Sequence, residues 1–242
     1  MKLIDKILYY VSVPKCVRCG SRLNIEDRGI CESCLCEYVS HKERNCASCG
    51  KPLHYCSCTN DYLDSHLIHN LVKVFRYQPD PKNVSSSLIY SLKRDNNRRV
   101  LDFLSDELVD AIRHSVDLPQ EYIFTSVPRR RSAKRKYGID HSMLLSSEVA
   151  RKLGAEYMEV LASKSKRAQK KAGSIENRIK NIDLRLKNSD IDLTGKKVII
   201  VDDIVTTGAS MGASAMLIKS AGAKSIAGAA LSIAYKDKKD FI

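Results

Sequence analysis

Two adjacent carboxylates and a hydroxyl-rich loop are the residues of this 242-residue chain whose types and spacing could do chemistry. Asp202 and Asp203 follow the apolar run 198–201, and residues 206–210 read Thr-Thr-Gly-Ala-Ser. Backbone N–H groups at the start of a helix favour a phosphate, whereas ionised carboxylates bind sugar hydroxyls or a divalent cation. A phosphorylated ribose would satisfy both halves of this stretch.

The flanking residues predict the elements that position this chemistry. Residues 198–201 are apolar and β-branched, which is typical of a strand buried on both faces of a parallel sheet. A helix follows, with Gly222 as its C-cap. One face of that helix would carry Ala213, Met216, Leu217 and Ser220. Open α/β sheets bind ligands at the carboxyl ends of their strands. The alternative is a buried strand that ends in an ordinary Asp/Thr turn.

The composition favours an anionic partner. The formal net charge is +13 and 43% of the residues are hydrophobic, so a sizeable core is available. Nucleic acid, an anionic membrane surface and phosphorylated small molecules all fit this charge, as does a solubilising surface without a polyanion partner. Residues 1–14 show no secretory signal and are too short to span a bilayer. They predict an amphipathic helix in a cytoplasmic protein, with docking at the inner face of the membrane as the alternative.

All nine cysteines fall between residues 16 and 58. Two CxxC pairs at short separation predict a tetrahedral zinc site, and a second set with a final CxC predicts another. The expected ligands are Cys16, Cys19, Cys31 and Cys34 for the first ion, and Cys46, Cys49, Cys56 and Cys58 for the second. Both sites would be structural, since protein thiolates fill all four positions. His54 is an alternative ligand, Cys36 is expected to be a small buried side chain or a stand-in ligand, and disulfides fit poorly with a reducing compartment.

The remaining pattern predicts an α/β domain over residues 61–242 behind a zinc-ribbon domain over residues 1–60. Strands are expected at 71–77, 121–127, 157–162, 182–186 and 225–235. Two helices that break near residue 95 are expected within 84–114, and a further helix should begin at Asp140. Six basic residues crowd into the loop 129–136 after the second strand, whose carboxyl end would aim them at the ligand crevice, and the alternative is a solvated charge run. The polar and basic stretch 163–181 is expected to be a mobile lid.

The order of these motifs resembles the ComF family, whose members join an N-terminal zinc ribbon to a type I phosphoribosyltransferase-like domain with a parallel sheet flanked by helices. The resemblance rests on the cysteine pairs, on Val-Pro-Arg-Arg-Arg at 127–131, on Arg167, Gln169, Arg178 and Asn181, and on residues 198–210. The chain departs from the family at 137–141, where it has Tyr-Gly-Ile-Asp-His, which implies an acceptor side of the pocket that differs from the family's or is lost.

The resemblance implies a role for each group of residues. Asp202 and Asp203 would contact the ribose hydroxyls and organise Mg²⁺ as the catalytic pair. The 5′-phosphate would be bound by Val205, Thr206, Thr207, Gly208, Ala209 and Ser210. The pyrophosphate loop would consist of Val127, Pro128, Arg129 and Arg130. The mobile loop would contribute Arg167, Gln169 and Arg178.

The expected function is therefore binding of 5-phosphoribosyl-1-pyrophosphate with Mg²⁺. Catalysis would transfer the phosphoribosyl group to an acceptor by positioning and electrostatic stabilisation, without a covalent nucleophile. The resemblance also implies a role in DNA uptake during natural transformation, with other competence proteins as partners. The alternative is a non-catalytic competence factor that reuses the fold to bind single-stranded DNA or a protein partner. Such DNA binding would weaken linearly with the logarithm of the salt concentration.

Overall fold

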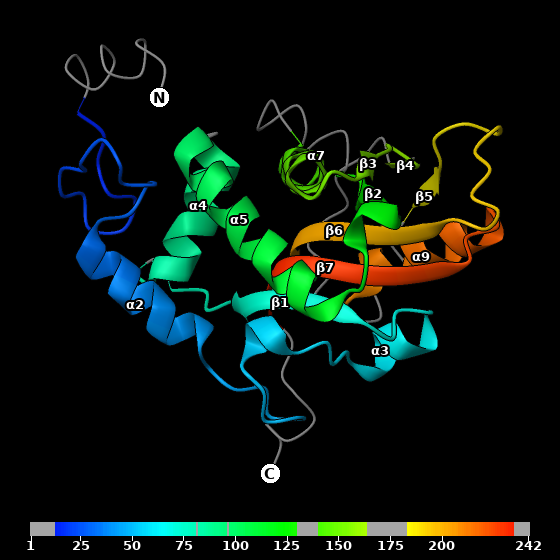
Figure 1. Ribbon diagram of the computed structural model, residues 1–242, viewed down its shortest axis with the longest axis horizontal. Coiled ribbons are helices and arrows are strands. Elements are labelled where there is room, and N and C mark those ends of the chain that lie inside the picture. The colour runs from blue at the N-terminus through cyan, green and yellow to red at the C-terminus, as the bar shows by residue number, and fades with distance from the viewer. Residues whose placement is uncertain (1–12, 81, 96, 130–139, 164–182, 235–242) are drawn as a thin grey trace.

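Five parallel strands form the central sheet of the computed structural model, which describes residues 13–80, 82–95, 97–129, 140–163 and 183–234 (Figure 1). The strand order is β1-β7-β6-β2-β3, and a separate antiparallel pair is formed by β4 and β5. The bounds are β1 Leu71–Arg76, β2 Tyr122–Ser126, β3 Glu156–Tyr157, β4 Leu161–Ser163, β5 Leu184–Leu186, β6 Lys197–Val205 and β7 Ser225–Ile233. The predicted buried parallel strand is confirmed, because β6 lies between β7 and β2.

Helices cover both faces of this sheet. The helices are α2 Glu32–Lys42, α3 Asp61–Ser65, α4 Val84–Asp95, α5 Arg98–Ser115, α7 His141–Leu153 and α9 Ala209–Ser220, with short 3-10 turns at Leu53–Tyr55 and Pro119–Glu121. Helices α2, α4, α5 and α7 pack on one face, and α3 and α9 pack on the other (Figure 1). Alternate residues of β6 serve the two cores: Ile199 and Val201 face the first, and Val198 and Ile200 face the second. This alternation explains why the strand is apolar throughout.

The cysteine-rich segment shares the first of these cores. Tyr38 of α2 is 1% exposed. Its ring meets Phe75 of β1 at 5.8 Å and Phe103 of α5 at 5.1 Å between centroids, both edge to face. Its hydroxyl donates to a carboxylate oxygen of Glu107 at 3.0 Å. The segment therefore packs into the core of the α/β part. The division at residue 60 stays a prediction.

Most predicted elements are present, and two differ. The expected strand 157–162 is two short strands, because Met158 donates to the Phe124 carbonyl and the chain then leaves the sheet for β4. The predicted face of the last helix is wrong, since Met216 is 49% exposed. The buried face of α9 instead includes Met211, Ser214, Ala215 and Ile218. Gly222, with φ of 95°, follows the C-cap Ala221 as a terminating glycine.

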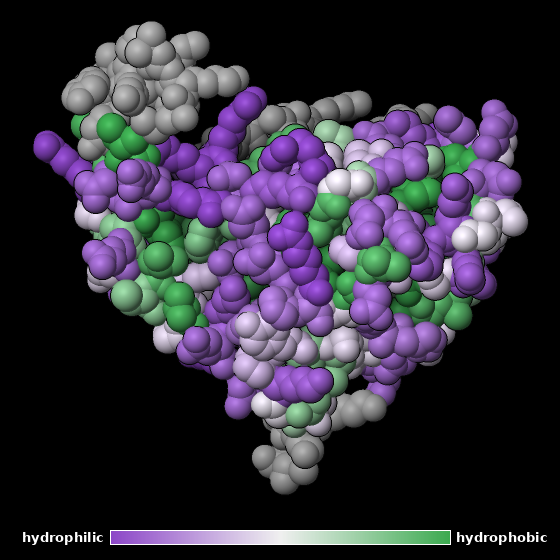
Figure 2. All heavy atoms as spheres, viewed as in Figure 1, coloured by the Kyte–Doolittle hydropathy of each residue, from purple (hydrophilic) through white to green (hydrophobic). Residues whose placement is uncertain are grey.

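The face of the molecule in Figure 2 is mostly hydrophilic, with apolar side chains in small groups between the hydrophilic ones. Across the described residues, no helix combines the length and apolarity that crossing a bilayer requires. The predicted helix within residues 1–14 falls almost wholly outside the described residues. The predicted lid does too, apart from Ser163.

Candidate functional site

The two aspartates lie near the carboxyl end of β6 and face different partners. Asp203 is 5% exposed, and its Oδ2 accepts from Arg129 Nη2 at 2.6 Å and lies 3.1 Å from Lys93 Nζ. Asp202 is partly buried, and its Oδ1 accepts from Ser142 Oγ at 3.0 Å and from the Asp203 N–H at 2.9 Å. One carboxylate is therefore neutralised by two cations, and the other is held by neutral donors.

This difference shifts the ionisation of Asp202. Burial, followed by the negative charge of Asp203, raises the pKa of Asp202 from 3.8 to about 7. The Asp203 N–H, Lys93 and Ser142 act in the opposite direction. An incoming cation or hydrogen-bond donor would therefore favour the ionised form of Asp202.

The cations come from two elements beside β6. Strand β2 pairs with β6, and the N–H of Val127 extends this pairing by donating to the Val201 carbonyl at 3.0 Å. Pro128 and Arg129 follow at the carboxyl edge of the sheet, as the sequence predicts. Lys93 lies in the last turn of α4. Arg130 and the lid residues Arg167, Gln169 and Arg178 lie outside the described residues.

The start of α7 completes this side of the site. Asp140 caps the helix by accepting from the Met143 N–H and also accepts from the Arg129 N–H, both at 3.3 Å. His141 is fully buried, and this burial, together with the charge of Arg129, lowers its pKa. Ser142 then reaches Asp202. The sequence predicts the helix start, but not the contact that Ser142 makes.

The Thr-Thr-Gly loop, residues 205–210, begins one residue beyond the aspartates. Val205, Gly208 and Ala209 are buried, Thr207 is half-buried, and Thr206 and Ser210 are exposed. Gly208 is the N-cap of α9 with φ of 85°, and Thr207 Oγ1 accepts from the Ala209 N–H at 3.3 Å. The loop therefore presents hydroxyl groups to solvent at a helix N-terminus, which is an arrangement suited to an anion.

A short helix lies against this loop. A Cβ on Gly208 would approach Leu63 Cγ of α3 to 2.6 Å, and a Cβ on Gly212 would approach Tyr62 and His66 to 3.0 and 2.9 Å. Gly208 therefore leaves the space that Leu63 of α3 occupies. Asn60 and Leu63 were missed, and the only available signal was an Asn at the start of a short helix.

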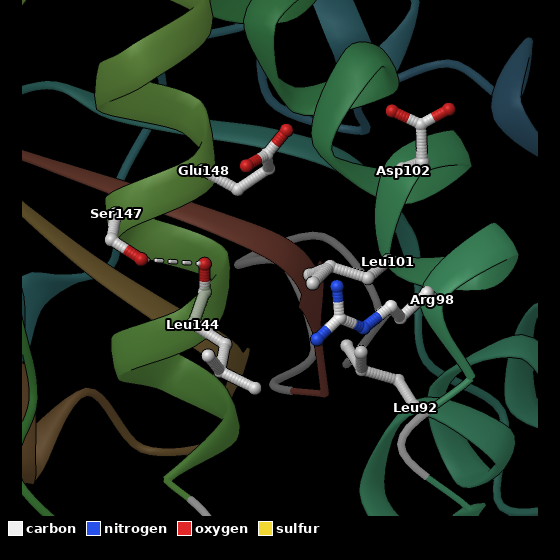
Figure 3. A pocket seen from close by; sticks show the side chains of 7 residues that line it. All are labelled: Leu92, Arg98, Leu101, Asp102, Leu144, Ser147 and Glu148. Carbon is white, nitrogen blue, oxygen red and sulfur yellow. Dashed lines mark hydrogen bonds between the residues drawn. The ribbon is translucent and has the colours of Figure 1, made fainter. Parts of the chain in front are cut away.

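A separate cavity of about 380 Å³ lies between α5 and α7 (Figure 3). Leu92, Leu101 and Leu144 line it together with Arg98, whose guanidinium extends among the leucines. The lining also includes Asp102, Ser147 and Glu148. Residues 144, 147 and 148 lie on the face of α7 that meets α5, opposite Ser142. This cavity is therefore distinct from the carboxylate site.

The first cysteine group (Cys16, Cys19, Cys31 and Cys34) has its four sulfurs within 4.8 Å of one another. Residues 16–20 form a tight turn, called here the first knuckle. Gly20, with φ of 74°, closes this turn by donating its N–H to the Cys16 carbonyl at 2.9 Å. Cys31 is the N-cap of α2. Hydrogen bonds from Ser21 lower the pKa of Cys19 to about 6. This supports a thiolate ligand.

The second cysteine group (Cys46, Cys49, Cys56 and Cys58) repeats this geometry, with Gly50 also at φ of 74°. Zinc–sulfur bonds of about 2.3 Å imply tetrahedral sulfur–sulfur distances of about 3.8 Å. The observed 3.6 Å between Cys19 and Cys31 and 3.5 Å between Cys49 and Cys56 fit. Both groups could therefore hold zinc ions.

The two other candidate ligands, His54 and Cys36, lie outside both cysteine groups. His54 is buried outside the second group, where its Nδ1 lies 3.2 Å from the Lys42 carbonyl oxygen and its ring packs on Tyr55. Cys36 belongs to neither group and is exposed on α2, so the expectation of a buried side chain or a stand-in ligand is wrong. The reason is its position, because α2 buries Cys34 and Tyr38 and leaves Cys36 on its solvent side.

Comparison with known proteins agrees with this topology. The family model described as phosphoribosyl transferase domain matches residues 140–240, which include α7, the aspartates and the Thr-Thr-Gly loop. No curated protein matches the chain. The match and the topology, a mostly parallel sheet with helices on both faces, indicate a fold of the phosphoribosyltransferase type.

Similar solved structures include three enzymes with low identity. Purine phosphoribosyltransferase from Pyrococcus horikoshii is 20% identical, with 55% of this chain and 73% of that chain covered and a TM-score of 0.37. Adenine phosphoribosyltransferase from Thermoanaerobacter pseudethanolicus is 18% identical, with 57% and 82% covered and a TM-score of 0.38. Glutamine phosphoribosylpyrophosphate amidotransferase from B. subtilis is 18% identical, with 61% and 26% covered and a TM-score of 0.36.

Proposed function

We propose that the protein binds 5-phosphoribosyl-1-pyrophosphate with Mg²⁺ at the carboxyl ends of β2 and β6 and transfers the phosphoribosyl group to an acceptor. The observation that carries this proposal is the meeting of Arg129 and Lys93 on Asp203, directly before the Thr-Thr-Gly loop. One corner of the sheet thus offers cations for a pyrophosphate, acids for ribose hydroxyls and a helix N-terminus for a 5′-phosphate.

Each group has a separate part in this reaction. Residues 205–210 would hold the 5′-phosphate, and Val127, Pro128, Arg129 and Arg130 would surround the pyrophosphate. Asp202 and Asp203 would accept hydrogen bonds from the ribose hydroxyls. Arg129 and Lys93 would turn from Asp203 to the departing pyrophosphate, and their positive charges would stabilise this leaving group. The carboxylates of Asp202 and Asp203 would also stabilise the positive charge that develops at the anomeric carbon.

The oxygen donors of the pair suit Mg²⁺, which would neutralise pyrophosphate charge when bound. Asp203 is already paired with two cations of the protein itself. We therefore expect Asp202 to be the first ligand to such an ion. Residues 163–181, with Arg167, Gln169 and Arg178, would close over the donor and exclude water.

Calorimetry with the donor and Mg²⁺ tests this function. The wild type should bind, and the double variant Asp202→Asn with Asp203→Asn should lose at least a hundredfold in affinity. The matched control is Asp183→Asn with Asp190→Asn, two exposed positions with the same charge change. The control should bind like the wild type. Absence of wild-type binding at millimolar donor would remove this proposal.

The resemblance to the ComF family extends the proposal to DNA uptake in natural transformation. In this role the protein would be cytoplasmic or peripheral to the inner face of the membrane, with single-stranded DNA and competence proteins as partners. The support is the order of cysteine pairs, basic loop and acidic motif, together with the net charge of +13. In a competent host, the double Asn variant should lower transformation frequency as far as deletion does. If the variant kept the wild-type transformation frequency, DNA uptake would not depend on binding of the phosphoribosyl donor.

A further inference from the structure

The second cysteine group is connected to the Thr-Thr-Gly loop by a short run of contacts. We propose that a zinc ion in this group positions the loop through Asn60 and Leu63, so that metal occupancy there sets the affinity of the loop for its ligand. The part of this inference that concerns the ligand rests on the proposed function. The part that concerns loop order does not.

The first link fixes the CxC turn on the sheet. Lys73 of β1 is 1% exposed, and its Nζ donates to the carbonyls of Cys56, Cys58 and Leu71 at 3.2, 2.6 and 3.3 Å. The Leu71 N–H donates to the Ser57 carbonyl at 3.0 Å. Three ammonium donors thus meet three backbone acceptors. The positive charge also offsets the net −2 of a zinc ion with four thiolates.

The second link joins this turn to the loop. Asn60 comes two residues after Cys58 and uses both ends of its amide. Its Oδ1 accepts from the Leu63 N–H at 2.9 Å and caps α3. Its Nδ2 donates to the Thr207 carbonyl at 3.3 Å. A displacement of the CxC turn would therefore reach both the start of α3 and the middle of the loop.

The third link is the packing of α3 against the loop glycine. Leu63 is fully buried, and its side chain occupies the space that a Cβ on Gly208 would need. Tyr62 and His66, stacked on each other at 4.0 Å, lie in the same way against Gly212. Helix α3 therefore forms a support beneath the first turn of α9, and it contacts both glycines of that turn.

The first cysteine group offers an internal control. Its knuckle faces the other core, where Val17 donates to the Gly29 carbonyl at 3.0 Å and Gly29 lies against Val100 of α5. Its buried members, Cys16 and Cys34, pack in the core with α4 and α5. Those of the second group pack with Leu63, Val205 and Met211. Loss of metal should therefore affect the loop more strongly when it occurs in the second group than when it occurs in the first.

The experiment compares Cys49→Ser with Cys19→Ser in the full-length zinc-loaded protein. These cysteines hold equivalent places in the two knuckles and both are exposed. Zinc content by mass spectrometry should fall from two ions to one in each variant. Hydrogen exchange is then followed at the amides of Ala209 and Gly212, which donate to Thr207 Oγ1 and the Gly208 carbonyl. Donor affinity is measured by calorimetry.

We expect Cys49→Ser to speed exchange at these two amides and to weaken donor binding, each at least tenfold more than Cys19→Ser does. Equal effects in the two variants, or none in Cys49→Ser, would overturn the inference. Because exchange is measured without ligand, a wild type that binds no donor would refute the proposed function while the exchange data still decide this inference.

A second variant tests the connection without disturbing the metal. Asn60→Ser keeps an acceptor for the Leu63 N–H but is too short to reach Thr207. Both zinc ions and the thermal midpoint should be retained, while exchange at Ala209 rises and donor affinity falls about fivefold. Unchanged exchange in a variant that keeps its two zinc ions would show that the contact with Thr207 carries no positioning, and would contradict the proposal.

Discussion

At the scale of single residues, the site separates two adjacent carboxylates by their neighbours. Asp203 faces Arg129 and Lys93, whereas Asp202 faces Ser142 and a backbone N–H. The pair therefore carries one carboxylate that is already compensated and one that gains most from a new cation or donor. This asymmetry gives Asp202 the larger response to ligand and to pH.

Asp202→Asn should stabilise the protein above neutral pH. The pKa of Asp202 is raised from 3.8 to about 7, so the wild type loses stability as pH rises from 4 to 7, because the unfolded chain ionises first. One pKa unit is about 1.4 kcal/mol, and with partial solvent contact we expect a gain of about 2 kcal/mol at pH 8. Urea unfolding at pH 4 and pH 8 measures it. A gain of the same size at both values would contradict the assignment.

Lys93→Met should weaken binding of the phosphoribosyl donor about tenfold, since one charge-assisted contact contributes roughly 1.4 kcal/mol or more. Its loss should also raise the pKa of Asp202 further, because Lys93 opposes that shift. The adjacent Arg94→Met is the matched control, since Arg94 is exposed and its guanidinium lies over the ring of Tyr90. Calorimetry of both variants decides the point, and equal losses would assign the effect to net charge alone.

At the scale of elements, two glycines with similar backbone angles serve different purposes. Gly20 in the first knuckle has φ of 74°, and a Cβ added there would meet no atom within 4 Å. Gly208 at the start of α9 has φ of 85°, and a Cβ added there would meet Leu63. Gly20 is therefore needed only for its left-handed backbone conformation. Gly208 is needed both for that conformation and for the space that a Cβ would take from Leu63.

Gly20→Ala should cost about 1 kcal/mol of folding stability from the left-handed backbone alone. Gly208→Ala should cost about 3 kcal/mol or more, because the added methyl group also overpacks against Leu63. Urea denaturation of the zinc-loaded variants compares the two directly. If Gly208→Ala were no worse than Gly20→Ala, α3 would not press on the loop in solution.

At the scale of the whole molecule, the cysteine-rich segment and the sheet share a core. Tyr38 packs on Phe75 and Phe103, and Glu107 of α5 accepts from the Tyr38 hydroxyl and pairs with Lys42 at 2.6 Å. Zinc bound to the two cysteine groups would therefore stabilise more than their own segment. Zinc binding to such sites contributes roughly 10 kcal/mol or more to folding.

Removing zinc should lower the thermal midpoint of the entire chain in one transition. Scanning calorimetry with and without a strong chelator measures this. The fragment 61–242 should be poorly soluble, because it would expose Phe75 and Phe103 to water. If this fragment instead folds with the wild-type midpoint, the shared core adds little and the predicted boundary at residue 60 marks an independent domain.

The sequence by itself determined the features that depend on local order. Apolar runs identified strands β1, β2, β6 and β7, and spacing identified the four cysteines of each group. The stretch 198–210 placed two acids before a helix N-terminus. These features are readable because a strand, a knuckle or a helix start is formed by residues that are neighbours in the chain.

Only the tertiary structure decided which distant residues meet. Lys93 reaches Asp203 from α4, Ser142 reaches Asp202 from α7, and Asn60 reaches Thr207 across 147 positions of sequence. The buried face of α9 was also settled this way, since Met211 packs where Gly228 of β7 leaves room. Such contacts depend on how elements pack, and packing is fixed by the joint shape of two surfaces, which neither segment encodes alone.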